Sequence, residues 1–241
     1  MIPVIFKNVK KYYNEKMILD NVSFDVAENK ITSIIGRSGS GKSTILKIIN
    51  GLVHPSGGEI KVFEKEIDYN KISELRLQIG YSVQGTALFP HLNVYDNITL
   101  LAGLNNWKRE KINERCENLM KLVSLTPEFK TKYPFELSGG EQQRAGICRA
   151  MMLNPKIFLL DEAFGALDPT TKSEIHQELL KIQSTEPRTI VMVTHDLHEA
   201  FRLSDQIIVI EKGIVRQIGT KEEISHSTNE FVKYFVKSQF E

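Results

Sequence analysis

The spacing of apolar and polar positions predicts strands near both ends of the chain and helices between them. Short apolar or alternating runs, several of them rich in β-branched residues, predict strands at 4–9, 22–26, 31–35, 79–83, 157–160, 190–194, 206–210 and 214–218. Helices are expected at 43–50, 111–123, 170–183 and 198–203, and around 231–236. Strands that alternate with helices favour a mostly parallel α/β sheet covered on both faces, and the helical stretch from about 88 to 152 is explained as an insertion.

The composition narrows the class of protein without naming a function. With 41% hydrophobic residues and a net charge of +1, the chain of 241 residues is neither disordered nor suited to coating nucleic acid through bulk charge. Two cysteines are too few for a disulfide framework and are expected as reduced thiols. The N-terminus lacks the apolar core of a signal peptide, and no apolar run is long enough to span a bilayer.

A glycine-rich stretch after the strand at 31–35 matches the pattern G-x-x-x-x-G-K-[ST]. It comprises Gly36, Arg37, Ser38, Gly39, Ser40, Gly41, Lys42 and Ser43, followed by Thr44. Glycines let backbone N–H groups converge on phosphate oxygens, and the following helix points its free N–H groups at the same anion. Lys42 is expected to reach the β- and γ-phosphates of a nucleotide, and Ser43 to bind Mg²⁺. Arg37 either adds positive charge or faces solvent as an ordinary loop residue.

Two acidic residues, Asp161 and Glu162, follow the apolar run at 157–160. The carboxyl end of a parallel strand is where nucleotides bind in open α/β sheets. Asp161 is therefore expected to hold Mg²⁺, usually through water, and Glu162 to polarise the attacking water. On its own, such a pair would equally fit a solvated strand end; the glycine-rich loop favours the catalytic interpretation.

A second helix start carries Ser138, Gly139 and Gly140. A serine and two glycines at a helix N-terminus can bind an anion, but they can also be an ordinary capped helix. The residues alone leave both interpretations open, because one nucleotide does not obviously need two such sites more than 90 residues apart.

Taken together, the motifs closely resemble those of the ATP-binding subunits of ABC transporters. LSGGEQQR at 137–144 resembles the signature motif, GRSGSGKST at 36–44 the Walker A loop, and IFLLDE at 157–162 the Walker B strand. Further matches are Gln84 to the Q-loop, Ala166-Leu167-Asp168 to the D-loop and His195 to the switch histidine. The resemblance implies a P-loop NTPase ABC cassette: a RecA-like core at about 1–87 and 153–241 with an antiparallel β subdomain, and a helical subdomain at about 88–152.

The resemblance also implies a reaction and a second copy of the chain. Two copies would pack head to tail, with each ATP between the Walker A loop of one copy and Ser138, Gly139 and Gly140 of the other. ATP and Mg²⁺ are the implied cofactors, and ATP hydrolysis to ADP and phosphate would depend on Lys42, Gln84, Glu162 and His195. Ser43, Gln84 and Asp161 would hold the metal, and Asp168 would lie near the nucleotide. Tyr13 is expected to stack on adenine, with Tyr12 as the fallback; packing on the strand surface is the alternative interpretation of either ring.

The kind of transporter is indicated by local similarity. The segment 161–169 is similar to the importer form DEPFGALDP, with Ala163 in place of proline, and 104–112, 132–138 and 229–232 are similar to cassettes for glycine betaine and choline. This implies import of an osmoprotectant, quaternary amine or amino-acid-like solute by a peripheral subunit on the cytoplasmic face, with permease partners and, indirectly, a substrate-binding protein. Exporter or lipid-transport cassettes are the alternative. A non-transport ABC ATPase acting on nucleic acid is disfavoured, because no basic patch or coiled-coil insertion is present.

The segment after Gln84 contains a candidate docking surface for the permease. Leu88 and Phe89 are expected either to receive a short helix of the membrane subunit or to pack internally. Trp107 either borders the same groove or packs within the helical region.

Overall fold

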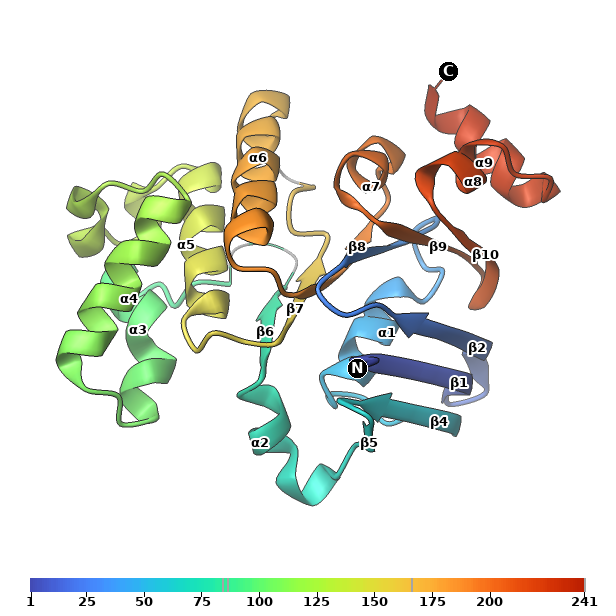
Figure 1. The fold of residues 1–241 in the computed structure, drawn as a ribbon, viewed down its shortest axis with the longest axis horizontal. Coiled ribbons are helices and arrows are strands. Elements are labelled where there is room, and N and C mark those ends of the chain that lie inside the picture. Colours follow the sequence, from blue (N-terminus) through green and yellow to red (C-terminus); the bar gives the residue numbers. More distant parts are fainter. Residues whose placement is uncertain (84, 86, 166, 241) are drawn as a thin grey trace. The chain divides into compact units, whose positions relative to one another are not determined.

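The computed structural model describes residues 1–83, 85, 87–165 and 167–240, and it divides into two compact units (Figure 1). Residues 1–79 and 188–241 form the first unit, and residues 80–187 form the second. Among the described residues, no helix is long and apolar enough to cross a membrane.

The first unit contains an antiparallel sheet with the strand order β2-β1-β4-β5 (Figure 1). Its strands are β1 (Val4–Tyr13), β2 (Lys16–Val26), β4 (Gly57–Val62) and β5 (Lys65–Glu66). Phe6 on β1 lies opposite Phe24 on β2, and their stacked rings are 4.5 Å apart. Val4, Phe6 and Val9 of β1 are buried, whereas Lys7 and Asn8 between them are exposed, so one face of the sheet packs on the core and the other faces outward.

A second set of strands in this unit has the order β10-β9-β3-β8. Its members are β3 (Ile31–Ile35), β8 (Thr189–Thr194), β9 (Gln206–Glu211) and β10 (Ile214–Gly219). Strand β3 runs parallel to both β8 and β9, whereas β9 and β10 form an antiparallel hairpin. Every residue of β3 and β8 is buried, as expected for parallel strands covered on both faces.

Helices of the first unit are α1 (Lys42–Ile49), α2 (Ile72–Arg76), α7 (Leu197–Leu203), α8 (Lys221–Ser225) and α9 (Glu230–Phe240). A buried cluster joins Ile35 at the end of β3 to Leu197 on α7, Ile224 on α8 and both Val232 and Phe235 on α9. The end of β3 is therefore held by side chains from the last third of the chain.

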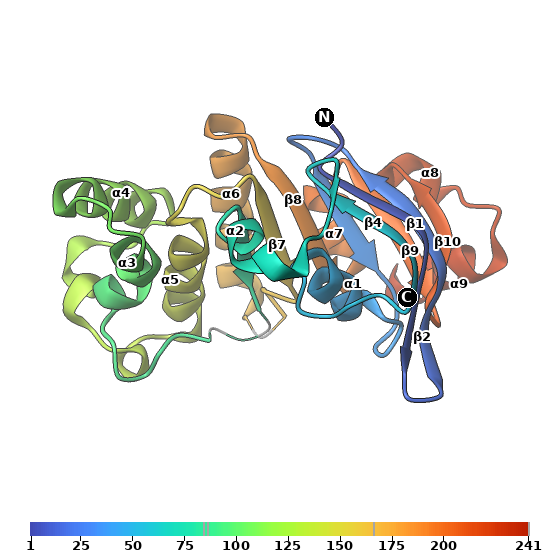
Figure 2. The same ribbon diagram turned by 90° about the horizontal axis from the view of Figure 1, so that it is seen from below.

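The second unit contains two strands and a group of helices. Strands β6 (Ile79–Ser82) and β7 (Ile157–Asp161) are neighbours. The helices are α3 (Val94–Leu104), α4 (Arg109–Leu122), α5 (Gly139–Met151) and α6 (Pro169–Thr185), with short 3-10 turns at Pro127–Thr131 and Pro134–Glu136. Figure 2 shows α3, α4 and α5 grouped together, and both α4 and α5 also contact α6.

The predicted α/β class is confirmed, as are its antiparallel β part and its inserted helices. Strand β4 is not among the predicted strands, because Gly57 and Gly58 at its start are typical of turns. Residues 57–62 form a strand because they pair with β1, where Val4 lies opposite Val62 and Phe6 opposite Ile60.

Candidate active site

The glycine-rich loop joins β3 to α1, and backbone geometry explains two of its glycines. Gly41 is the N-cap of α1 with φ +99°, and a Cβ there would lie 2.7 Å from Leu19 Cδ2. A Cβ on Gly36 would lie 2.1 Å from the carbonyl oxygen of Ile210. No side-chain hydrogen bond caps α1 at Gly41, and the first-turn N–H groups of a helix point toward its N-terminal end, which here is the loop.

Lys42 is the first residue of α1, and it is only 4% exposed because its side chain folds back onto the loop. Its Nζ donates hydrogen bonds to the carbonyl oxygens of Gly36, at 2.9 Å, and Arg37, at 3.1 Å. The hydroxyl of Ser40 is also buried and has no hydrogen-bond partner among the described residues. A buried cation, a buried hydroxyl and a glycine-capped helix start form a donor-rich cradle that fits the phosphates of a nucleotide.

A turn from the C-terminal part of the chain supports the same loop. Gly213, between β9 and β10, donates its N–H to the carbonyl of Ser40 at 3.0 Å and accepts the N–H of Asp20 at 2.9 Å. A Cβ on Gly213 would lie 2.2 Å from the carbonyl oxygen of Ile18. The turn is thus wedged between strand β2 and the phosphate loop.

His195 lies at the same edge of the first unit as the phosphate loop. Ile35, the last residue of β3, is in register with Thr194, the last residue of the parallel strand β8. His195 follows directly and is exposed. Asp196 fixes the turn, because its N–H bonds to Thr194 Oγ1 at 3.0 Å and its carboxylate caps α7. This register therefore places His195 and the phosphate loop, both predicted to be part of the site, at the same edge of the sheet.

Tyr12 and Tyr13 both lie near the end of β1 and are 40% and 45% exposed. Lys11 Nζ lies 4.9 Å from the centre of the Tyr13 ring. Asn14, in the turn that follows, has φ +52°, which asparagine tolerates better than most residues. Neither ring is in the core, so both are available to an aromatic ligand.

In the second unit, Asp161 ends β7 and is only 5% exposed. The hydroxyl of Tyr81 on β6 donates to Asp161 Oδ2 at 3.1 Å. Burial and the neighbouring carboxylate raise the pKa of Tyr81 far above its ordinary value, so Tyr81 stays a neutral donor. Glu162 follows with φ +45°, a left-handed conformation that is costly for a non-glycine residue and turns the chain sharply after the strand.

The signature segment starts helix α5 with a reciprocal cap. Ser138 Oγ accepts the N–H of Glu141 at 3.3 Å, and Glu141 Oε2 accepts the N–H of Ser138 at 2.7 Å. The prediction that this segment caps a helix is thus confirmed. The cap leaves the serine O–H proton able to donate to an anion, so the two interpretations are compatible.

The two glycines of this segment differ in what surrounds them. A Cβ on Gly140 would lie 2.4 Å from Thr171 Cγ2 on α6, so packing between the helices requires glycine there. A Cβ on Gly139 would have only Leu167 Cδ2 nearby, at 4.0 Å, so packing among the described residues does not require glycine. The space beside Gly139 would therefore allow a ligand or another chain to approach its backbone closely.

Asp168 is the N-cap of α6 and lies close to the start of α5. Its Oδ1 accepts the N–H groups of Thr170 and Thr171, both at 3.1 Å. Hydrogen bonds from Thr171 lower the pKa of the Asp168 carboxyl below its ordinary value. Asp168 therefore stabilises the start of α6, in addition to any role near a nucleotide.

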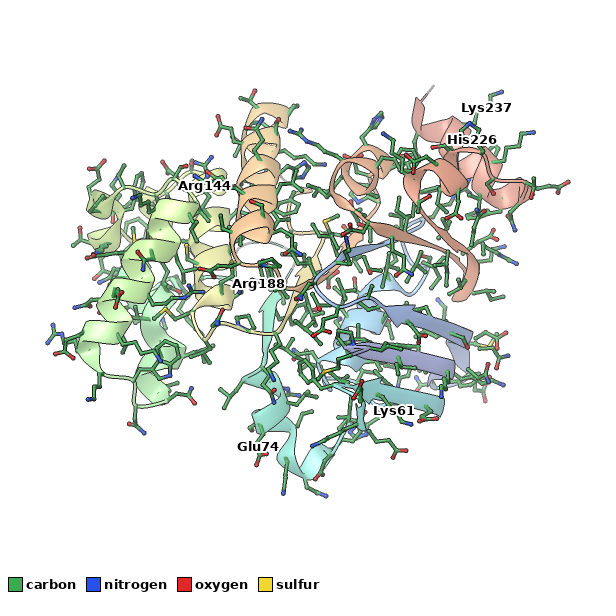
Figure 3. The ribbon with its side chains drawn as sticks, viewed as in Figure 1. Lys61, Glu74, Arg144, Arg188, His226 and Lys237 are labelled. Carbon is green, nitrogen blue, oxygen red and sulfur yellow. The ribbon has the colours of Figure 1, made fainter. Side chains whose placement is uncertain are left out.

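Two predicted positions, Gln84 and Ala166, lie outside the described residues. Sequence reasoning missed Tyr81, because a tyrosine within a strand is typical of core packing and only the side-chain contact reveals its link to Asp161. It also missed Arg144 on α5, which pairs with Glu174 on α6 at 2.7 Å (Figure 3).

Divalent metal binding is consistent with the donors present. Among the described residues, no three His, Cys, Asp or Glu side chains cluster as a self-contained metal site. Asp161 in the second unit offers a carboxylate and Ser43 in the first unit offers a hydroxyl, and each is a hard oxygen ligand of the kind that Mg²⁺ prefers. The donor chemistry thus fits a metal that arrives with a nucleotide.

A glycine-capped helix after a buried parallel strand, with a lysine inside the loop, defines a P-loop nucleotide-binding domain. The family model described as "ABC transporter" matches residues 19–165. The chain therefore belongs to the ABC transporter family, and the predicted resemblance is confirmed.

Several relatives are named as transport or uptake ATP-binding proteins. The chain is 43% identical over 228 residues to the glycine betaine/carnitine/choline transport ATP-binding protein OpuCA of Bacillus subtilis, covering 94% of this chain and 60% of that one. It is 39% identical over 231 residues to the glycine betaine uptake system ATP-binding protein YehX of Escherichia coli, covering 95% of this chain and 75% of that one. The chain spans about 60% of the length of OpuCA and of the choline transport ATP-binding protein OpuBA of the same organism.

Solved structures agree with the fold. A dimeric post-hydrolysis structure of the ATP-binding cassette MJ0796, bound to ADP and Pi, matches with a TM-score of 0.82 and 34% identity, covering 90% of this chain and 98% of that one. The cbiO1 protein of Clostridium perfringens matches with a TM-score of 0.87 and 28% identity, covering 98% of this chain and 95% of that one. The predicted ABC cassette fold is confirmed by these matches.

Proposed function

We propose that this chain binds and hydrolyses ATP as the motor subunit of an ABC importer for glycine betaine, choline or a related quaternary amine. The observation that carries the enzymatic part is the phosphate loop, in which the Lys42 ammonium is held by two loop carbonyls beside the uncapped start of α1. A cation beside the backbone N–H groups of a helix N-terminus would stabilise the charge that phosphoryl transfer spreads over phosphate oxygens.

The remaining residues would have the following roles. Ser43 and Asp161 would hold Mg²⁺, which when bound neutralises phosphate charge. Tyr81 keeps the Asp161 carboxylate oriented through its hydrogen bond. Glu162 would orient the attacking water, because it follows directly after the strand that ends at Asp161. His195 and Gln84 would approach the γ-phosphate, and Tyr13 or Tyr12 would stack on adenine.

A second copy of the chain would complete each ATP site. The open face of Gly139 and the donor proton of Ser138 support this arrangement, because both are available at the start of α5 without disturbing its cap. The similar MJ0796 cassette is dimeric, which supports the same assembly for this chain.

The permease would dock on the second unit. Leu88 is buried, which fits internal packing, whereas Phe89 remains exposed. Trp107 lines a surface cavity of about 470 Å³ together with Arg115 and Leu153, and Lys111 Nζ lies 3.9 Å from the centre of its ring. An exposed aromatic ring and a cavity with apolar and basic walls would suit a short helix of a membrane subunit. Docking there would place the chain at the cytoplasmic face of the membrane.

The quaternary-amine substrate rests on the names of the relatives, since transport specificity would reside in the permease and its binding protein. A cassette of an exporter or lipid-transport system is the alternative.

Hydrolysis is tested with the purified chain and three variants. Lys42→Ala should lose ATP binding, and Glu162→Gln should retain binding, lose turnover and accumulate as an ATP-dependent dimer. Glu74→Gln, an equivalent change at an exposed position on α2 (Figure 3), should behave as the wild type. Wild-type turnover by Glu162→Gln would show that the assigned role of Glu162 is wrong.

Transport is tested on the complex purified from native membranes with its permease partners. ATP-driven uptake of choline or glycine betaine into vesicles is expected, and it should stop with Glu162→Gln. A permease partner that moves lipid, or moves solute outward, would overturn the importer assignment and favour the alternative.

A further inference from the structure

The phosphate loop has a contact that none of the expected roles uses. Arg37 is exposed, and its guanidinium carbon lies 5.6 Å from the centre of the Tyr234 ring on α9. Among the described residues, no carboxylate forms an ion pair with Arg37, so Tyr234 is the side chain that faces its guanidinium. An arginine over a tyrosine ring at this distance is a cation–π contact.

The backbone of Arg37 matters more to the loop than its side chain. Its carbonyl oxygen accepts hydrogen bonds from Lys42 Nζ at 3.1 Å and from the N–H of Ser40 at 3.2 Å. Any rotation of residue 37 would therefore displace both the catalytic lysine and the backbone of Ser40. A contact that restrains the Arg37 side chain also restrains this carbonyl.

Helix α9 is itself firmly placed. Asn229 caps it, because Asn229 Oδ1 accepts the N–H groups of Phe231 at 3.1 Å and Val232 at 3.2 Å. Val232 and Phe235 are buried in the cluster that contains Ile35, the residue just before the loop. Tyr234 projects from the opposite side of this helix and is 59% exposed, so it presents a ring from a fixed base.

We propose that Tyr234 is a positioning residue for the phosphate loop: its ring holds the Arg37 side chain and thereby helps to fix the carbonyls that anchor Lys42. Helix α9 then supports the loop in two ways: its buried residues pack in the cluster with Ile35, which precedes the loop, and Tyr234 contacts Arg37 within the loop. The inference deepens the proposed function, on which its kinetic test rests. It gives α9 a part in ATP affinity, although no residue of α9 is among those expected to bind the nucleotide.

The kinetic test compares four variants. Tyr234→Leu should raise the KM for ATP about two- to fivefold, the factor to which an exposed cation–π contact corresponds, with kcat unchanged. Tyr234→Phe keeps the ring and should restore the wild-type KM, and Lys233→Ala, at an exposed position beside it on α9, should have no effect. In an Arg37→Leu background, Tyr234→Leu should add nothing. Equal KM values for Tyr234→Leu and Lys233→Ala, or additive effects of the Arg37 and Tyr234 changes, would overturn the proposal.

A second measurement separates this inference from the proposed function. Hydrogen exchange of the amides of residues 36–42 in nucleotide-free protein should be about two- to fivefold faster in Tyr234→Leu than in Tyr234→Phe. If the wild type failed to hydrolyse ATP, the proposed function would be wrong while the exchange comparison still tested the contact. If the wild type hydrolysed ATP and exchange were equal in both variants, only the role of Tyr234 would be wrong.

Discussion

Gly139 and Gly140 are adjacent, yet replacing each with alanine should change the free energy of unfolding in opposite directions. A Cβ on Gly140 would approach Thr171 Cγ2 to 2.4 Å, about 1 Å closer than an ordinary contact. Thr171 cannot easily rotate away, because its hydroxyl is hydrogen-bonded to Asp168. Overpacking of this kind costs about 1–3 kcal/mol, against a gain of up to about 1 kcal/mol when alanine replaces glycine in a helix.

An approach of 2.4 Å calls for the upper part of this cost, so Gly140→Ala should lower the free energy of unfolding by about 1–2 kcal/mol, and the melting temperature by about 2–4 °C for each kcal/mol. Thr171→Ser removes the clashing methyl group and keeps the hydroxyl, so it should restore the stability of Gly140→Ala. Gly139→Ala meets no close atom and should be as stable as the wild type or more so, by up to about 1 kcal/mol. Gly103→Ala, at an exposed position on α3 with no atom nearby, is the matched control.

Thermal unfolding and light scattering separate the two roles. In a Glu162→Gln background, Gly139→Ala should weaken ATP-dependent dimerisation at least about tenfold while its melting temperature does not fall. Gly103→Ala should leave dimerisation unchanged. Wild-type dimerisation by Gly139→Ala would refute the idea that a second copy approaches this face, and an unchanged melting temperature for Gly140→Ala would refute the packing argument.

Three further predictions concern individual side chains. Tyr81→Phe leaves the buried Asp161 carboxylate without this donor, so urea unfolding should show a loss of about 1–3 kcal/mol, and an unchanged midpoint would count against the bond. The folded state lowers the pKa of Asp168 below its ordinary 3.8, so the charged cap stabilises the fold above about pH 4 and loses this effect as the pH falls through the lower folded value. Unfolding at several pH values should therefore show Asp168→Asn less stable than the wild type near neutrality but equal to it in strong acid, whereas a constant difference would contradict this. Burial raises the pKa of the Cys116 thiol to about 11 and that of Cys148 well above its ordinary value, so a thiol reagent at pH 8 should react with both only after denaturation, and rapid labelling of the native protein would contradict their burial.

Local motifs made the phosphate loop predictable from the sequence. Its glycines, lysine and serine lie within eight consecutive positions, and the strand and helix on either side follow from short-range patterns. Strands β9 and β10 were predicted from equally local apolar runs, at 206–210 and 214–218. These elements need no knowledge of distant parts of the chain.

Contacts between distant segments could not be predicted in this way. Strand β4 starts with two glycines and is a strand only because β1 pairs with it. The register of Ile35 with Thr194, which brings His195 to the edge of the phosphate loop, joins residues more than 150 positions apart. The packing that requires glycine at 140 depends on Thr171, which no pattern within the signature segment reveals.

The turn at Gly213 has a practical consequence for engineering this protein. Tips of β-hairpins are usually chosen for epitope tags, fluorescent reporters and new chain ends, because they tolerate insertion. Here the tip is bonded on one side to Ser40 and on the other to Asp20, with no room for even one additional carbon atom beside Ile18. A label inserted between β9 and β10 would separate the phosphate loop from strand β2, so tags are better placed away from this hairpin.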